Sequence, residues 1–303
     1  MTDAATKHAG LRAGPVLYML VAVALFALMD TGLKLLAPHY PPLQVATLRG
    51  ASALPLVLGW TLATIGARAL LRVHWPLHLL RGVLGVVMMA CFVYGLRTLP
   101  LSTTYAITFI APLLVTAMAV PFLGEKVGPR RWIAIVVGLV GVLVVLRPTG
   151  QGVMTLGGLA ILLAAVCYAA SAITVRLLAQ RDSTQAMVFW LMLILVVGGG
   201  ALSWHEWTPI QARHWWVIAG IGIVGTLAQV TLTEAFRRGE ASMIAPLEYT
   251  ALVWGVLLDL TLWQVLPDGM TWVGAAIIIA SGLYLVRRER VHNVKQVPPV
   301  ELP

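Results

Sequence analysis

Six ionisable side chains lie inside long apolar stretches of this 303-residue chain. They are Asp30, Lys34, Arg49, Glu234, Glu248 and Asp259. A charge inside a lipid bilayer is costly, so such residues are rare and usually mark a substrate, ion or proton pathway. The alternative is a structural role, in which the charge is paired between packed helices. If the apolar stretches span a membrane, these six residues are the first candidates for binding or coupling groups.

Asp30 and Lys34 are spaced i, i+4 and therefore share one helix face. Such a pair can hold the two charged ends of a zwitterion, or it can neutralise itself and make the helix tolerable in lipid. Lys34 also lies near a helix end, from which its ammonium can reach the interface. Arg49 can pair instead with Asp30 across two neighbouring helices. The sequence leaves these alternatives open.

Glu248 lies next to Pro246, whose missing backbone donor loosens a helix. When the second half of the sequence is laid over the first so that Gly222 falls on Gly82, Glu248 falls on Thr108, one helical turn before Pro112. Two related helices thus carry a polar group near a proline at a matched depth. We expect these two polar groups to face each other across a substrate cavity, where Glu248 can also carry a coupling proton. The alternative is that Glu248 is protonated and hydrogen-bonded between packed helices.

Other polar and aromatic side chains recur at helical spacing on otherwise apolar segments, which favours a protein-facing or water-facing stripe. An aromatic-rich, weakly polar cavity suits amphipathic solutes. The predicted substrate-binding residues are Phe26, Asp30, Tyr105, Thr108, Tyr168, Ser171, Gln229, Thr233, Glu248 and Tyr249.

The composition is that of an integral membrane protein, because 59% of residues are hydrophobic and only 11% are charged. Soluble domains carry about 25% charged residues. Ten apolar segments approach the ~20 residues that cross a bilayer. They are 15–36, 43–65, 76–96, 101–123, 130–146, 155–178, 185–203, 214–235, 241–263 and 270–286. The first is too long for the apolar core of a signal peptide and is expected to be retained.

The positive charges alternate between the ends of these segments. With the N-terminus in the cytoplasm, sixteen Lys and Arg residues lie on the inner side and three on the outer side. This bias is typical of cytoplasmic loops. The net charge of +9 therefore indicates membrane orientation, and nucleic acid is not an expected partner. Both termini, residues 1–14 and 287–303, are predicted to be cytoplasmic tails.

The chain contains an internal repeat. The same shift along the sequence that lays Gly82 on Gly222 also lays Gly85 on Gly225. Each unit, 15–147 and 155–286, holds five helices, so the second copy must insert upside down relative to the first. Inverted repeats of this kind are a transporter architecture, with the substrate site near the middle of the membrane. The predicted fold is all-α, with ten transmembrane helices in two inverted five-helix repeats.

Small and helix-breaking residues are assigned structural roles. The four matched glycines allow helix backbones to approach closely. The two prolines are expected to act as hinges. The predicted structural or hinge residues are Pro112, Pro246, Gly82, Gly85, Gly222 and Gly225.

The sequence resembles the drug/metabolite transporter superfamily in its EamA-like branch, over residues 15–290. The features that carry the resemblance are Pro112, Gly124-Glu125, Trp132 and the Gly138–Gly141 spacing, then Ala245-Pro246-Leu247-Glu248-Tyr249-Thr250-Ala251, and Gly274–Gly282 before Arg287-Arg288-Glu289-Arg290. The second half departs from the family's Gly-Glu turn, because Gln264-Val265 replaces it. The resemblance implies a ten-helix carrier with both termini inside, similar to YddG-type amino-acid exporters.

Together these observations predict a secondary transporter in the bacterial inner membrane. We expect it to export small amphipathic metabolites, chiefly neutral or aromatic amino acids, by alternating access between the two repeats. The alternative is an uptake carrier for a nucleotide-like or vitamin-like metabolite. An enzyme is not expected, because the sequence has no metal-ligand spacing, no activated nucleophile and no phosphate-binding loop. No cofactor or metal is expected, and proton coupling stays open.

Overall fold

A computed structural model describes residues 2–99, 101–125, 128–146 and 156–264, together with 269, 272–274, 276–277, 279–281 and 284. All regular structure in these ranges is helical. Seven of the described helices are long and apolar enough to cross a membrane, and Ala111–Leu123 is a shorter apolar helix. The prediction of an all-α membrane protein is therefore confirmed. The last expected span, 270–286, lies partly outside the described residues.

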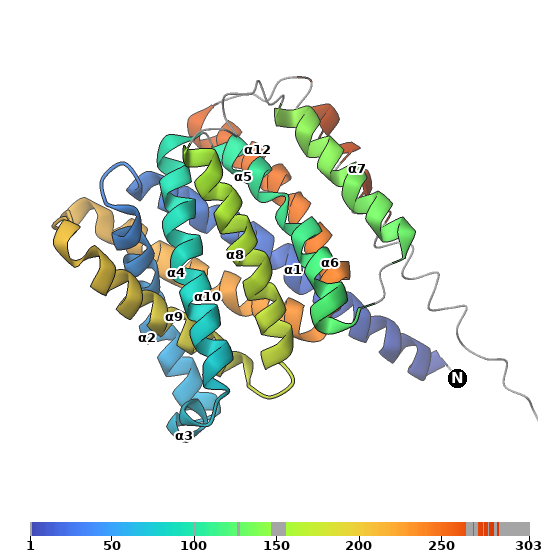
Figure 1. Ribbon diagram of the computed structural model, residues 1–303, viewed down its shortest axis with the longest axis horizontal. Helices are drawn as coiled ribbons and strands as arrows, with labels where there is room; N and C mark the ends of the chain where they lie inside the picture. Colours follow the sequence, from blue (N-terminus) through green and yellow to red (C-terminus); the bar gives the residue numbers. More distant parts are fainter. Residues whose placement is uncertain are drawn as a thin grey trace, which may run out of the picture.

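The long helices pack as a bundle in which most neighbours come from opposite halves of the chain (Figure 1). Six of the candidate spans contain α1 (Thr2–Leu36), α2 (Pro42–Thr64), α4 (Trp75–Thr98), α8 (Leu156–Leu178), α9 (Thr184–Ser203) and α10 (Trp215–Arg238), and the seventh is Ala245–Leu262. Helix α7 (Pro129–Leu146) packs against the segment 101–123. The short α3 (Ala67–Leu71) lies between α2 and α4.

Two segments expected as single spans are broken, which corrects the sequence-based boundaries. The segment 101–123 divides into α5 (Leu101–Thr108) and α6 (Ala111–Leu123). A proline at 112 has no amide hydrogen and its ring crowds the carbonyl one turn earlier, at Thr108, where α5 ends. The segment 241–263 divides in the same way into α11 (Ala241–Ile244), a 3₁₀ stretch η3 (Ala245–Thr250) and α12 (Ala251–Trp263). Glu248 therefore lies in a 3₁₀ turn rather than in a regular helix.

The helix boundaries recur along the chain. The shift that lays Gly82 on Gly222 also lays both ends of α4 on those of α10, and both ends of α6 on those of α12. A slightly longer shift lays both ends of Gly14–Leu36, the apolar part of α1, on those of α8. Each short helix α6 and α12 is followed by a left-handed residue, Gly124 (φ 65°) and Gln264 (φ 53°). The internal repeat found in the sequence is thus also a repeat of structure.

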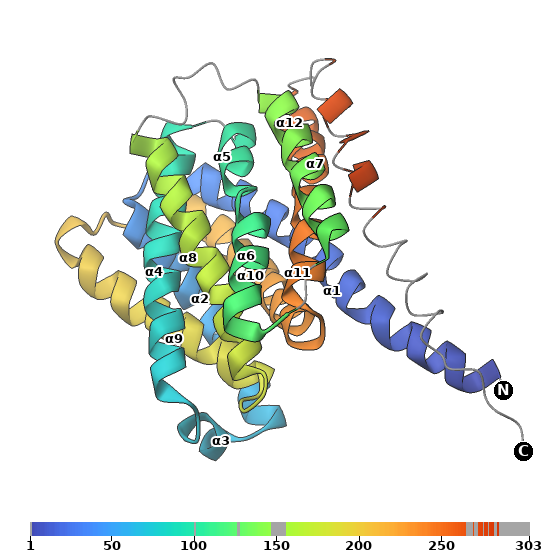
Figure 2. The ribbon, with the colours of Figure 1, turned by 45° about the vertical axis from the view of Figure 1, so that its right-hand side comes forward.

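The contacts between helices keep the same pattern when the two halves are exchanged. Helix α1 packs on α10, and its counterpart α8 packs on α4, the counterpart of α10. Helices α2 and α9 are counterparts and pack on each other. The pair α4 and α8 lies side by side in both views (Figures 1 and 2). Phe26 on α1 touches both of the larger apolar clusters of the core and so lies where they meet.

Gly222 lies where α10 and α2 approach each other closely. A Cβ at this position on α10 would lie 2.7 Å from the backbone oxygen of Ser52 on α2, which cannot move away alone. We expect Gly222→Ala to destabilise the protein by about 2 kcal/mol, the usual cost of overpacking. Gly220→Ala is the matched control, because a Cβ there meets nothing within 4 Å. Thermal unfolding of the two purified variants checks this, and equal melting temperatures would contradict it.

Candidate functional site

Asp30 forms a buried hydrogen bond between the first helix of the chain and the broken segment of the first half. Its side chain is 7% exposed, and its Oδ2 accepts a hydrogen bond of 3.0 Å from the hydroxyl of Tyr105 on α5. Lys34 is not the residue that bonds Asp30. Of the alternatives that the sequence left open, pairing of Asp30 with Lys34 or with Arg49, neither gives this hydrogen bond, which instead joins Asp30 to α5.

Glu248 makes the corresponding contact in the second half. The hydroxyl of Tyr168 on α8 donates a hydrogen bond of 2.8 Å to Oε1 of Glu248 in η3. Because α8 is the counterpart of α1 and η3 lies in the counterpart of α5–α6, each half carries one tyrosine–carboxylate bond between equivalent elements. The roles are exchanged, since the acid lies on the first helix in one half and on the broken segment in the other.

A line of aromatic rings connects the two acids. The ring of Tyr105 lies 6.4 Å from that of Phe109, which lies 5.5 Å from that of Tyr249, the neighbour of Glu248. Tyr249 is 1% exposed, and its hydroxyl has no hydrogen-bond partner among the described residues. The rings thus run from the partner of Asp30 to the sequence neighbour of Glu248. Five of the predicted binding residues belong to these contacts and are called the strip below: Asp30, Tyr105, Tyr168, Glu248 and Tyr249.

Arg49 on α2 lies beside this strip, although the predicted binding set does not include it. The side chain is 4% exposed, and its guanidinium carbon lies 6.0 Å from the ring centre of Phe26. Nη2 donates to Oε1 of Gln229 on α10 at 3.4 Å. Arg49 thus connects two further predicted residues, Phe26 and Gln229, to the region of Asp30. The sequence signal was the intramembrane charge, but spacing along the chain could not identify its neighbours.

The hydroxyls of the predicted threonines are occupied within their own helices. Thr108 donates to the carbonyl of Thr104 at 2.8 Å, and Thr233 donates to the carbonyl of Gln229 at 2.7 Å. Such back-bonding satisfies a hydroxyl without a ligand. Ser171 is half-buried, and its carbonyl accepts from Thr174. That Thr108 and Glu248 face each other across a cavity stays a prediction.

Two of the other intramembrane charges lie elsewhere. Glu234, at the end of α10, accepts from the hydroxyl of Thr184 and pairs with Arg237 and Arg238. Lys34 is half-buried near the end of α1. The side chain of Asp259 lies outside the described residues.

Charged contacts between the halves gather at one end of the bundle. His78 Nε2 lies 2.9 Å from Asp182 Oδ2, and Arg131 Nη1 lies 3.0 Å from Glu240 Oε2. Glu125 accepts from the backbone N–H of Ala241 at 2.9 Å. Sequence reasoning did not identify His78 and Asp182, because they are distant in sequence.

The opposite end of the bundle joins the halves through uncharged or imidazole groups. Tyr40 bonds His214 Nδ1 at 2.7 Å. The side chain of Gln44 exchanges two hydrogen bonds with the backbone of Thr208. The two ends of the bundle therefore differ in the chemistry of their contacts between the halves.

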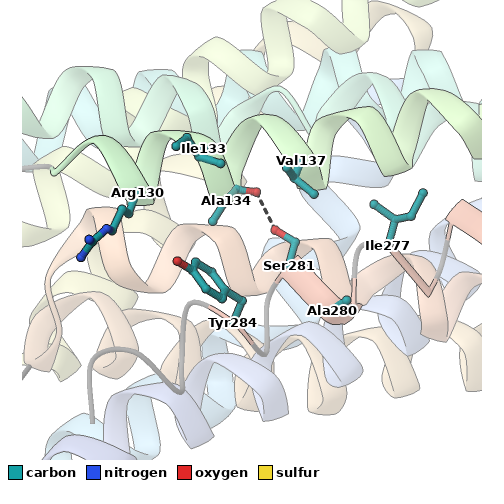
Figure 3. A pocket seen from close by; sticks show the side chains of 8 residues that line it. All are labelled: Arg130, Ile133, Ala134, Val137, Ile277, Ala280, Ser281 and Tyr284. Carbon is teal, nitrogen blue, oxygen red and sulfur yellow. Dashed lines mark hydrogen bonds between the residues drawn. The ribbon is translucent and has the colours of Figure 1, made fainter. Parts of the chain in front are cut away.

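A separate hollow of about 380 Å³ lies between α7 and the C-terminal segment (Figure 3). Its lining is Arg130, Ile133, Ala134, Val137, Ile277, Ala280, Ser281 and Tyr284, and Ser281 donates to the carbonyl of Ala134 at 2.5 Å. These described lining residues include no carboxylate and none of the predicted binding residues. The candidate site is therefore the strip around Asp30, Arg49 and Glu248.

Comparison with known proteins gives two matches to one family model. The model of the EamA-like transporter family matches residues 14–147 and again residues 155–287. A solved crystal structure matches with a TM-score of 0.78 and 20% identity, covering 91% of this chain and 98% of that one. At this identity the structural match supports the fold alone.

Curated relatives cover most of the chain at modest identity. The pseudopaline exporter of Pseudomonas aeruginosa is 28% identical over 91% of this chain and 96% of its own length. The riboflavin transporter of Vibrio cholerae is 29% identical over 90% of this chain and 93% of its own length. An S-adenosylmethionine uptake transporter of Rickettsia bellii is 28% identical over 73% of this chain and 75% of its own length. These relatives include exporters and uptake carriers.

Proposed function

The chain belongs to the EamA-like transporter family, and from this premise we propose that it exports small amphipathic metabolites, with neutral and aromatic amino acids as the leading class. It is a multi-pass transporter of the bacterial inner membrane rather than an enzyme. Its substrate is a small molecule, and the finer assignment rests on the site.

The observation that carries the proposal is the pair of tyrosine–carboxylate bonds, joined by the rings of Tyr105, Phe109 and Tyr249. The buried Asp30 and the half-buried Glu248 give places for an ammonium group, and the adjacent rings give apolar contact area. Arg49 adds the opposite charge nearby. A zwitterion with an apolar side chain matches this combination better than an ion or a sugar does.

We propose ten spans in two inverted five-helix repeats, 15–147 and 155–286, with both termini in the cytoplasm. The recurrence of helix bounds and the preserved contacts on exchange of the halves support a two-fold relation between them. Under this topology the charged contacts between the halves lie at the cytoplasmic end. Their breaking and re-forming would open and close access from that side, which is the motion that alternating access needs.

The second candidate is uptake of a vitamin-like or nucleotide-like solute, favoured by the names of two relatives. Export and uptake are separated in cells. Expression should raise resistance to a toxic amino-acid analogue and lower its steady-state content in the cells. Accumulation of labelled riboflavin or S-adenosylmethionine, without any gain in resistance, would contradict the export proposal and favour the second candidate.

A further inference from the structure

Arg49 is a buried guanidinium held by weak partners. Nε donates to the thioether sulfur of Met29 at 3.1 Å, and Nη2 donates to Gln229 Oε1 at 3.4 Å. A thioether is a poor acceptor, and the second contact is at the long end of the hydrogen-bond range. Nη1 has no hydrogen-bond partner within the part of the chain that the structure describes. Three of the five donors of the guanidinium are therefore uncommitted.

No carboxylate among the described residues forms an ion pair with Arg49. Asp30 acts on it electrostatically, but the Asp30 carboxylate bonds Tyr105 instead. A buried charge without a direct counter-ion costs several kcal/mol. Arg81 is buried to a similar extent and donates to the carbonyl of Met187 at 2.7 Å, although its Nε has no partner among the described residues. Arg49 differs in its acceptors, which are a thioether and a side-chain amide rather than a backbone carbonyl.

Arg49 lies where three helices meet. It lies on α2, and its partners lie on α1 and α10, which belong to opposite halves. At Gly225 on α10, a Cβ would come within 2.9 Å of Met29 Sδ and 3.9 Å of Arg49 Nε. The glycine leaves room for the thioether, because a Cβ would crowd the sulfur but would make only an ordinary contact with the guanidinium.

We propose that Arg49 anchors the carboxylate of the transported solute, with the amide nitrogen of Gln229 as a second donor. The inference rests on the proposed function and specifies which end of the substrate is held here. A carboxylate accepts two parallel hydrogen bonds from a guanidinium, and these charge-assisted bonds are stronger than the contacts they replace. The amide oxygen of Gln229 already faces Arg49, so its nitrogen is free to turn toward the same ligand. Asp30, on the neighbouring helix, then lies on the side of the solute's ammonium group.

The proposal predicts that recognition depends on the acid group and on Arg49. The test is thermal unfolding of the full-length protein in detergent, with phenylalanine, methionine, threonine, S-adenosylmethionine or riboflavin added. Each amino acid is compared with its amide, which keeps the side chain and ammonium but loses the negative charge. At least one acid should raise the melting temperature, and its amide should need roughly tenfold more ligand or fail, as expected from the loss of one charge-assisted bond.

The variants localise the effect. Arg49→Gln should remove the stabilisation by the acid, and Arg49→Lys should retain part of it because one charge remains. Arg81→Gln is the matched control: it should lower the melting temperature of the free protein but keep the shift caused by the acid. If Arg49→Gln does not fold, Arg49→Lys localises the effect, and equal binding of acid and amide by the wild-type protein would still overturn the proposal.

Failure of the anchor and failure of the proposed function give different results. An acid and its amide that bind equally would overturn the anchor and leave amino-acid transport standing. S-adenosylmethionine carries an amino-acid carboxylate, so stabilisation by it alone, lost in Arg49→Gln, would support the anchor and count against amino-acid export. Stabilisation by riboflavin alone, which has no carboxylate, would overturn both. A complete lack of stabilisation by every acid would also overturn the anchor.

Discussion

Glu248→Gln is expected to abolish transport while expression and melting temperature stay close to wild type. Glutamine has nearly the same shape and still offers an oxygen to the hydroxyl of Tyr168, so the packing of α8 against η3 should persist. The variant loses the negative charge that binds an ammonium group or carries a proton. Loss of about 3 kcal/mol of charge-assisted binding corresponds to roughly 100-fold in rate at low substrate concentration.

The measurement is initial-rate efflux of a labelled amino acid from proteoliposomes that contain equal amounts of each protein. Glu206→Gln provides the control, because it makes the same chemical change at an exposed carboxylate outside the strip. Normal efflux by Glu248→Gln would assign Glu248 to helix packing. A large fall in melting temperature would indicate that the charge itself stabilises the bundle.

Asp182→Ala is expected to destabilise the protein by about 3 kcal/mol, because alanine would leave one buried donor and one half-buried donor of the other half without a partner. The loss of such a partner costs about 1–3 kcal/mol for a buried donor. Asp182 is 8% exposed and accepts from His78 Nε2 at 2.9 Å and from the backbone N–H of His74 at 3.1 Å. The expected fall in melting temperature is several degrees.

Asp182→Asn separates the two contributions to this effect. Asparagine keeps an oxygen for one donor but removes the charge, so its melting temperature should lie between those of wild type and Asp182→Ala. Thermal unfolding of the purified proteins measures both variants. A melting temperature of Asp182→Ala within a degree of wild type would show that this contact between the halves is energetically unimportant.

The sequence predicted the all-helical membrane character and the repeat, because both depend on long, regular patterns. An apolar run of about 20 residues has few alternatives to a membrane helix. Equivalent helices keep their lengths, so a nearly constant shift along the chain identifies α4 with α10 and the apolar part of α1 with α8. The sequence analysis did not place helix boundaries inside the segments 101–123 and 241–263, because apolar residues continue through each break. It did single out Pro112 and Pro246, which lie at these breaks, as hinges.

The contacts within the site were harder to predict. Asp30 has Lys34 one turn away in sequence, yet its hydrogen bond comes from Tyr105 on another helix. Periodicity identifies which residues share a face, but the angle at which helices cross determines which faces meet. Glu234 shows the same limit, since its partners Thr184, Arg237 and Arg238 place it at a helix end.

Gln264 shows how a departure in sequence can preserve a structure. It replaces the glycine found at the equivalent position, Gly124, and yet both residues adopt a left-handed conformation after α12 and α6. A side chain in this conformation costs about 1–2 kcal/mol. The turn is therefore kept in the second half without the glycine that makes it inexpensive in the first half.

Efflux from proteoliposomes preloaded with labelled phenylalanine, methionine or threonine, with and without an imposed pH gradient, tests the central claim most directly. We expect saturable efflux of at least one of the three, competed by the others and reduced in Glu248→Gln and Arg49→Gln. A requirement for the gradient would make Asp30 and Glu248 the proton-carrying candidates, whereas efflux without it would make them substrate-binding groups. Efflux equal to that of protein-free vesicles for all three amino acids would contradict the account.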